Sequence, residues 1–178
     1  MRAARPLVAS LAVVAAALTA FGCSSKSNPV ASGGAIWQMQ GASCQDRTTH
    51  TLAVVDPNGG APSLLTDGAD GARVRCQLSS SSFSVLVANG NGTLIASGSL
   101  SGANGTNVAM TISLPGGTYQ TTTQKCLLAV TANDGSNFKA DINCPELDNT
   151  SLPGDECSIS NTGTSVHSFF SFQNCSGF

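Results

Sequence analysis

Few side chains in this sequence could act as a general base, and neither histidine lies in a catalytic pattern. His50 ends the polar run Arg47-Thr48-Thr49-His50, and His167 alternates with apolar residues as on the face of a sheet. Hydrolysis by an activated serine needs a base within hydrogen-bond reach of the nucleophile. No Gly-x-Ser-x-Gly sequence is present to place such a serine on a sharp turn. We therefore predict no catalytic residues and keep a hydrolase as a distant alternative.

Carboxylates are the second group that could do chemistry. Four of them surround two prolines, and two more flank a Gly-Ala step: Glu146, Asp148, Asp155 and Glu156, and Asp67 and Asp70. A pair of carboxylates could hydrolyse a glycosidic bond, and either group could offer oxygen ligands to calcium. Neither group has the full spacing of a calcium loop. The sequence therefore predicts no metal site and no cofactor.

The first of the seven cysteines follows a segment of distinct composition. Arg2 and Arg5 precede an apolar stretch over residues 7–21, which leads into Gly22 and Cys23. A positive start, an apolar centre and a small residue before the cut are typical of a secretory signal. The apolar stretch is shorter than the ~20 residues that a membrane-spanning helix needs. We predict that residues 1–22 are a signal peptide.

The junction Thr19-Ala20-Phe21-Gly22-Cys23 resembles the lipobox of bacterial lipoproteins, with Gly22 and Cys23 in its last two positions. Two other positions depart from the lipobox pattern: lipoproteins usually have leucine where this chain has Ala20, and a small residue where it has Phe21. The resemblance implies cleavage before Cys23, whose sulfur then carries a diacylglyceryl group, with palmitate as an expected acyl chain. The alternative is ordinary cleavage near Ala17 or Ala20, which leaves Cys23 as a free thiol.

The lipoprotein resemblance carries an expectation about location. Two or more acyl chains hold a protein on a membrane essentially permanently. Ser24 follows the cysteine directly, and this resembles the sorting signals that favour the outer membrane of the bacterial cell envelope, with the domain facing either the periplasm or the outside.

Composition divides the rest of the chain into a tether and one domain. Residues 23–34 are poor in apolar side chains and are predicted to form a lipid-anchored flexible tether, followed by a single domain over residues 35–178. Beyond residue 22, six Lys and Arg stand against ten Asp and Glu, a net charge of about −4. Nucleic acid is excluded as a partner, because its binding depends on many cations.

The domain shows the two-residue period of β-strands. Val108, Met110, Ile112 and Leu114 alternate with smaller or polar residues, and the runs over residues 83–87 and 94–100 do the same. Asn-Gly steps at residues 89–92 and 104–105 favour tight hairpins. We predict an all-β fold: an antiparallel two-sheet β-sandwich, which could be a jelly roll, of about 8–10 short strands.

One disulfide follows from strand register. Cys126, Leu128 and Val130 alternate along one strand, and Ala140, Ile142 and Cys144 along the next. A three-residue loop over 134–136 with a glycine bulge places Cys126 opposite Cys144, at a spacing that a disulfide can span. The other four cysteines allow three pairings, and short sequence separation favours Cys157–Cys175 and Cys44–Cys76. With Cys23 acylated, three bridges use the remaining six cysteines.

Two aromatic residues are candidates for ligand binding. Trp37 and the single tyrosine, Tyr119, could stack on a sugar ring if they lie on the surface, whereas Trp37 could equally be the core tryptophan of a small sandwich. We predict a membrane-anchored lipoprotein that acts as a non-enzymatic interaction or structural module, with a glycan or a protein as partner. A glycan- or ligand-binding module is the alternative.

Overall fold

The computed structural model describes residues 29–53 and 63–177. The predicted signal peptide, Cys23 and the first part of the predicted tether lie outside the described residues. Among the residues that are described, no helix is long and apolar enough to cross a membrane.

The described chain is all-β, as predicted, with thirteen strands and one short 3-10 helix, η1 (Ala69–Gly71). The strands are β1 (Ser32–Gln40), β2 (Thr49–Leu52), β3 (Leu65–Thr66), β4 (Arg73–Leu78), β5 (Ser82–Asn89), β6 (Gly92–Ser101), β7 (Asn104–Leu114), β8 (Gly117–Gln120), β9 (Cys126–Asn133), β10 (Phe138–Asn149), β11 (Glu156–Ile159), β12 (Phe169–Gln173) and β13 (Ser176–Gly177). The number exceeds the predicted eight to ten because strands of two to four residues, such as β3 and β13, are too short to show alternation in the sequence.

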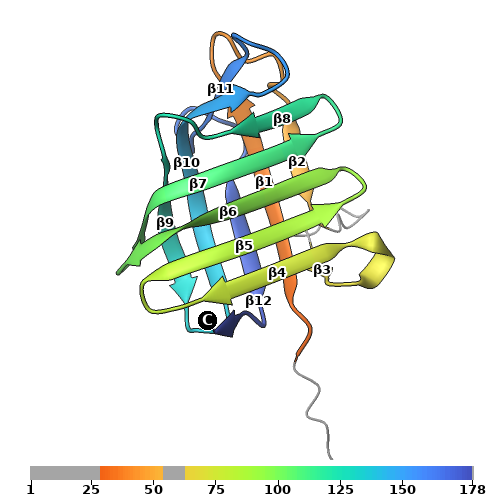
Figure 1. Ribbon diagram of the computed structural model, residues 1–178, viewed down its shortest axis with the longest axis vertical. Helices are drawn as coiled ribbons and strands as arrows, with labels where there is room; N and C mark the ends of the chain where they lie inside the picture. Colours follow the sequence, from red (N-terminus) through yellow and green to blue (C-terminus); the bar gives the residue numbers. More distant parts are fainter. Residues whose placement is uncertain (1–28, 54–62, 178) are drawn as a thin grey trace, which may run out of the picture.

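Hydrogen bonds join these strands into one sheet in the order β11-β1-β12-β10-β8-β7-β6-β5-β4-β13, with β2 and β3 on β1 and with β9 between β10 and β7. Pairing is antiparallel throughout the described residues except between β13 and β4. In Figure 1, β4 to β8 lie side by side and cross in front of β1, β9, β10 and β12, which run at a steep angle to them. The sheet is therefore folded into two layers.

Alternation explains the long strands and the core between them. Val108, Met110 and Ile112 are all buried, as the period of two predicts. Phe83 on β5 packs on Phe138 of β10, with ring centroids 5.1 Å apart, so side chains of the two layers meet. Aromatic and aliphatic side chains thus fill the space between the layers in one cluster.

At two glycines a neighbouring side chain leaves little room for a Cβ. A Cβ added at Gly33 would lie 2.4 Å from Cδ1 of Phe172. Gly105 was predicted to lie in a turn, but it is part of β7, where an added Cβ would lie 3.0 Å from Cβ of Leu128. The β6–β7 turn comes earlier, at Gly102, which has a φ of 58°.

The predicted tether ends earlier than expected. Ser32, Gly33 and Gly34 belong to β1 and pair with β12, opposite Gln173, Phe172 and Ser171. Their lack of apolar side chains suggested a flexible linker, but at Gly33 the absence of a side chain leaves room for the ring of Phe172.

Three disulfides join the six cysteines of the domain. Cys126 is bonded to Cys144, the pair that strand register predicts. The predicted pairs Cys44–Cys76 and Cys157–Cys175 are wrong, because the structure joins Cys44 to Cys157 and Cys76 to Cys175. Sequence proximity was misleading, since β1 pairs with β11 and β4 pairs with β13, and these pairings bring distant cysteines together.

Candidate functional site

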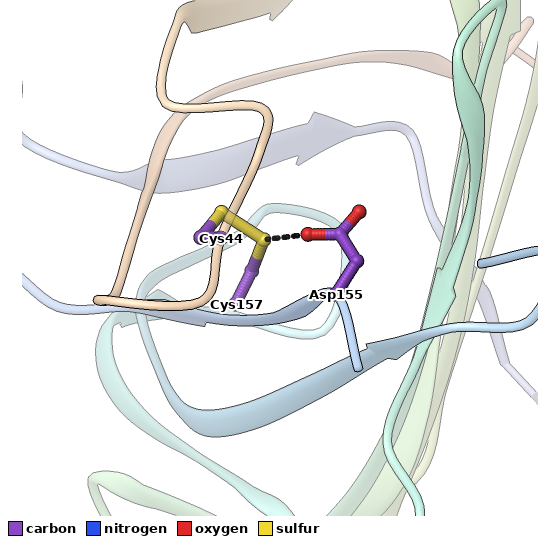
Figure 2. Close-up of side chains that lie close together, drawn as sticks. All are labelled: Cys44, Asp155 and Cys157. Atoms are coloured by element: carbon purple, nitrogen blue, oxygen red, sulfur yellow. Dashed lines mark hydrogen bonds between the residues drawn. A yellow bond between two sulfur atoms is a disulfide. The ribbon is translucent and has the colours of Figure 1, made fainter. Parts of the chain in front are cut away.

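A cluster of sulfur and oxygen atoms lies where the loop after β1 meets β11. Cys44, Asp155 and Cys157 are all buried, and their possible ligand atoms lie within 4.8 Å of one another (Figure 2). The dashed line in Figure 2 joins Sγ of Cys157 to Oδ1 of Asp155 at 3.7 Å. A disulfide sulfur carries no proton and is not a thiolate, so this contact is neither a hydrogen bond nor part of a metal site.

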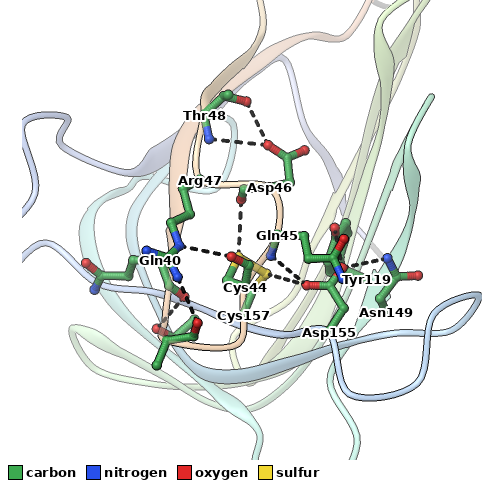
Figure 3. Close-up of a disulfide and its surroundings, with 12 residues drawn as sticks. Gln40, Cys44, Gln45, Asp46, Arg47, Thr48, Tyr119, Asn149, Asp155 and Cys157 are labelled. Atoms are coloured by element: carbon green, nitrogen blue, oxygen red, sulfur yellow. Dashed lines mark hydrogen bonds between the residues drawn. A yellow bond between two sulfur atoms is a disulfide. The ribbon is translucent and has the colours of Figure 1, made fainter.

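Asp155 accepts three hydrogen bonds at the centre of this cluster. Its Oδ1 accepts from the backbone N–H of Gln45 at 2.8 Å, and its Oδ2 accepts from the Tyr119 hydroxyl at 2.9 Å and from Nδ2 of Asn149 at 2.8 Å (Figure 3). The donors come from the loop after β1, from β8 and from the end of β10. The carboxylate therefore ties together three segments that are distant in sequence.

Burial and these hydrogen bonds shift the pKa values of Asp155 and Tyr119. Burial alone would raise the pKa of the Asp155 carboxyl, but hydrogen bonds from Asn149, Gln45 and Tyr119 outweigh burial and hold the pKa below its ordinary value. Burial, the hydrogen bond to Asp155 and the charge of Asp155 raise the pKa of Tyr119 to about 12. Asp155 is only 2% exposed and its oxygens are occupied, so it serves the fold and not a substrate.

Arg47 closes the loop around the same disulfide. Its Nε donates to the carbonyl of Cys44 at 2.9 Å, and its Nη2 donates to the carbonyl of Ala42 at 2.8 Å (Figure 3). The guanidinium thus supports the loop backbone on one side while the Asp155 carboxylate holds it on the other.

His50 has polar neighbours, but their arrangement does not suit catalysis. Its Nε2 lies 3.0 Å from Oδ2 of Asp46 and 3.1 Å from the Thr48 hydroxyl, which itself lies 2.7 Å from Oδ1 of Asp46. A catalytic triad places the carboxylate and the nucleophile on opposite ring nitrogens. Here both neighbours share one nitrogen, so His50 cannot be oriented by Asp46 while accepting the proton of Thr48.

His167 lies on the outer surface of the sheet. Its Nε2 is 2.9 Å from Oδ1 of Asp141, and its ring is 6.1 Å from that of Phe169. The ring of Phe169 is covered by Lys139, whose Nζ lies 4.8 Å from the ring centroid. In the described part of the chain, no hydroxyl or thiol forms a hydrogen bond with His167, so this pair also lacks a nucleophile.

Both aromatic residues proposed as a ligand platform are buried, and that prediction is wrong. Trp37 is 0% exposed and stacks on His50 with ring centroids 5.5 Å apart, while Tyr119 is 3% exposed. Ala35, Trp37 and Met39 alternate along β1 and all face the core. A sugar ring cannot reach either aromatic face.

Three of the remaining acids make local hydrogen bonds. The Thr122 hydroxyl lies 2.7 Å from an oxygen of Glu146 and 2.7 Å from an oxygen of Asp148, and Oδ1 of Asp67 accepts from the backbone N–H of Val74 at 2.7 Å. Thr122 brings two partly exposed carboxylates together, whereas Asp67 binds the backbone of β4.

An open groove of about 330 Å³ lies on the outside of the sheet. Leu127 and Ala129 on β9, Asp141 and Asn143 on β10, Asn104 at the start of β7, and residues 160–162 after β11 line it. Sequence reasoning missed this site, although a signal was present. If Cys126 and Leu128 face the core, then Leu127 must face outward, and it does so with 54% of its surface exposed.

Comparison of the chain with protein-family models, curated proteins and solved structures finds no match.

Proposed function

We propose that the chain is an exported bacterial lipoprotein, held on a membrane through Cys23, whose domain acts as a non-enzymatic interaction module in the cell envelope. The observation that carries this proposal is the pairing of the cysteines. The sequence has seven, and the three disulfides use six of them, all in the domain. The seventh is Cys23, the residue that follows the signal-like segment.

The disulfides also support an extracytoplasmic location. Bridges form and persist in oxidising compartments, whereas thiols in the bacterial cytosol are kept reduced. Ser24 after the cysteine supports the outer membrane as destination. We further propose that the two layers form a β-sandwich, which the contact of Phe83 with Phe138 across the layers supports.

The non-enzymatic part of the proposal is supported by the histidines. Asp46 and Thr48 share one nitrogen of His50, and His167 pairs with Asp141 on an open surface. Neither arrangement activates a nucleophile. What the surface does offer is the groove beside Leu127, which suits binding of a partner and favours a ligand-binding role as the second candidate.

Acylation of Cys23 is the test. The full chain and its Cys23→Ser variant are produced in a bacterium supplied with labelled palmitate, with Ser25→Ala as the matched control. The wild type and Ser25→Ala should carry label, enter the membrane fraction and show acyl mass on an N-terminal Cys23. Cys23→Ser should carry no label. A wild-type protein with no acyl mass, or with an N-terminus other than Cys23, contradicts the proposal.

A further inference from the structure

We infer that the groove formed by β9, β10 and residues 160–162 binds one pyranose ring of an uncharged glycan. This inference rests on the proposed role as an interaction module and gives that role a site and a ligand class. It moves the glycan hypothesis from buried Trp37 and Tyr119 to a different surface.

One wall of the groove, formed by residues 160–162, is held rigidly. The side chain of Asn161 makes two hydrogen bonds to the backbone of Ser168: its Oδ1 accepts from N–H at 2.6 Å and its Nδ2 donates to the carbonyl at 3.1 Å. The same carbonyl accepts from the N–H of Ile142 on β10 at 3.0 Å. The segment that carries residues 160–162 is therefore fastened to the sheet, and the groove exists before a ligand arrives.

Uncommitted polar groups face this groove. Within the described residues, the side-chain amides of Asn104 and Asn143 take part in no hydrogen bond. Asp141 is oriented by His167 through Oδ1, which leaves Oδ2 to accept a hydrogen bond. An amide donates and accepts, as a sugar hydroxyl does, so two amides and a carboxylate oxygen can pair with several hydroxyls of one ring.

Apolar surface lies beside these groups. Leu127 is 54% exposed and Ala129 is also exposed, and both line the groove with Asn143 and Asp141. A pyranose ring presents C–H groups on its faces and hydroxyls around its edge. Covering Leu127 with the C–H face removes apolar area from water while the edge meets the amides.

The charge of the groove argues against anionic ligands, and its size limits how much of a ligand it can hold. Among the described residues that line it, none is Lys or Arg and the one charged group is the carboxylate of Asp141, so phosphate and other anions are disfavoured. Its volume of about 330 Å³ is at the lower limit of small-molecule sites. One ring fits this space, and because the groove is open, neighbouring rings can extend along the surface.

The experiment uses the chain from residue 23 on, with Cys23→Ser, labelled with ¹⁵N and titrated with three uncharged tetrasaccharides: fully N-acetylated chitotetraose, cellotetraose and mannotetraose. We expect saturable shifts of the Asn104, Leu127 and Asn143 signals with at least one of them. A shallow site for one ring should bind with a Kd of about 1 mM. Response to chitotetraose alone assigns recognition to the N-acetyl group, and response to all three assigns it to the ring.

Two variants and one control test the location of the site. Leu127→Lys and Asn143→Ala change exposed side chains and should each weaken binding about tenfold or more. Ile95→Lys is the control, because Ile95 is 41% exposed on β6 of the other layer, and it should bind as the parent does. The spectra of all three report whether the fold is kept.

Three results would overturn the inference: no saturable shift with any tetrasaccharide up to about 10 mM, ten times the expected Kd; shifts that map away from the groove; or equal loss of binding in Ile95→Lys. The titration needs no acyl group. It can therefore fail while Cys23 is acylated, and it can succeed while Cys23 is not, so the outcome is separate from that of the acylation test.

Discussion

Ionisation of Tyr119 can be followed by itself, because it is the only tyrosine of the chain. Burial first, and then the hydrogen bond and charge of Asp155, raise its pKa to about 12. An unfolded tyrosine ionises near pH 10. The fold therefore holds the phenol in its neutral form, and the native protein should show no tyrosine ionisation near pH 10.

The difference between the two pKa values corresponds to about 2–3 kcal/mol of stability. Since the folded pKa is the higher one, this contribution is fully present below about pH 10. It is lost as the pH rises from about 10 through about 12. Over the same range, Tyr119→Phe should lose less stability than the wild type.

The assay is the near-ultraviolet absorbance of tyrosinate against pH, measured soon after each pH jump, with the chain in concentrated denaturant as the unfolded reference. Asp155→Asn is the informative variant. It removes the negative charge but leaves the burial, so the midpoint should fall part of the way towards 10. A native protein, with folded circular dichroism, that titrates near pH 10 would refute the reasoning.

Three further changes have expected outcomes. The pKa of Asp155 lies below its ordinary value, so wild-type stability should fall as the pH drops from about 4 through the lower folded pKa, and urea unfolding should show a weaker acid dependence for Asp155→Asn. Gly33→Ala places a Cβ 2.4 Å from a ring carbon of Phe172 and should lower the free energy of unfolding, measured by thermal unfolding, by about 1–3 kcal/mol. Gly116→Ala is the control, because no atom lies near its added Cβ, and it should change the free energy of unfolding by under about 0.5 kcal/mol. Replacing both cysteines of the Cys44–Cys157 bridge by alanine should lower the free energy of unfolding in guanidinium by about 5 kcal/mol, and the same change at Cys126–Cys144 by about 3 kcal/mol. The first bridge should contribute more because it closes a loop of 113 residues, against 18 for the second. The reverse order would contradict an entropic origin of the stabilisation.

Features that depend on local pattern were predictable from the sequence. Alternation identified the long strands, and the register that places Leu128 opposite Ile142 is the register of the structure. Agreement ends near the hairpin loop, where an irregularity between Lys139 and Ala140 shifts the pairing. A one-residue bulge of this kind leaves the apolar alternation on either side intact, so the pattern of side chains does not reveal its position.

Features that depend on topology were not predictable. Nothing in the residues near Cys44 indicates that β1 will lie beside β11, because the pairing of distant strands is decided by the whole sheet. The partner of Tyr119 is likewise 36 residues away. The groove was predictable only in part. The outward direction of Leu127 follows from strand register, whereas the wall formed by residues 160–162 comes from a distant loop.

The order of the bridges has a consequence for how such a chain matures. Along the chain, the first cysteine of the domain is joined to the fifth, the second to the sixth and the third to the fourth. A polypeptide that emerges from a membrane with its N-terminus leading exposes Cys44 and Cys76 long before Cys157 and Cys175. An oxidase that joins consecutive thiols would then trap a non-native link, which only thiol–disulfide exchange can undo. If the chain is exported as we propose, its maturation should therefore depend on a disulfide isomerase and not on an oxidase alone.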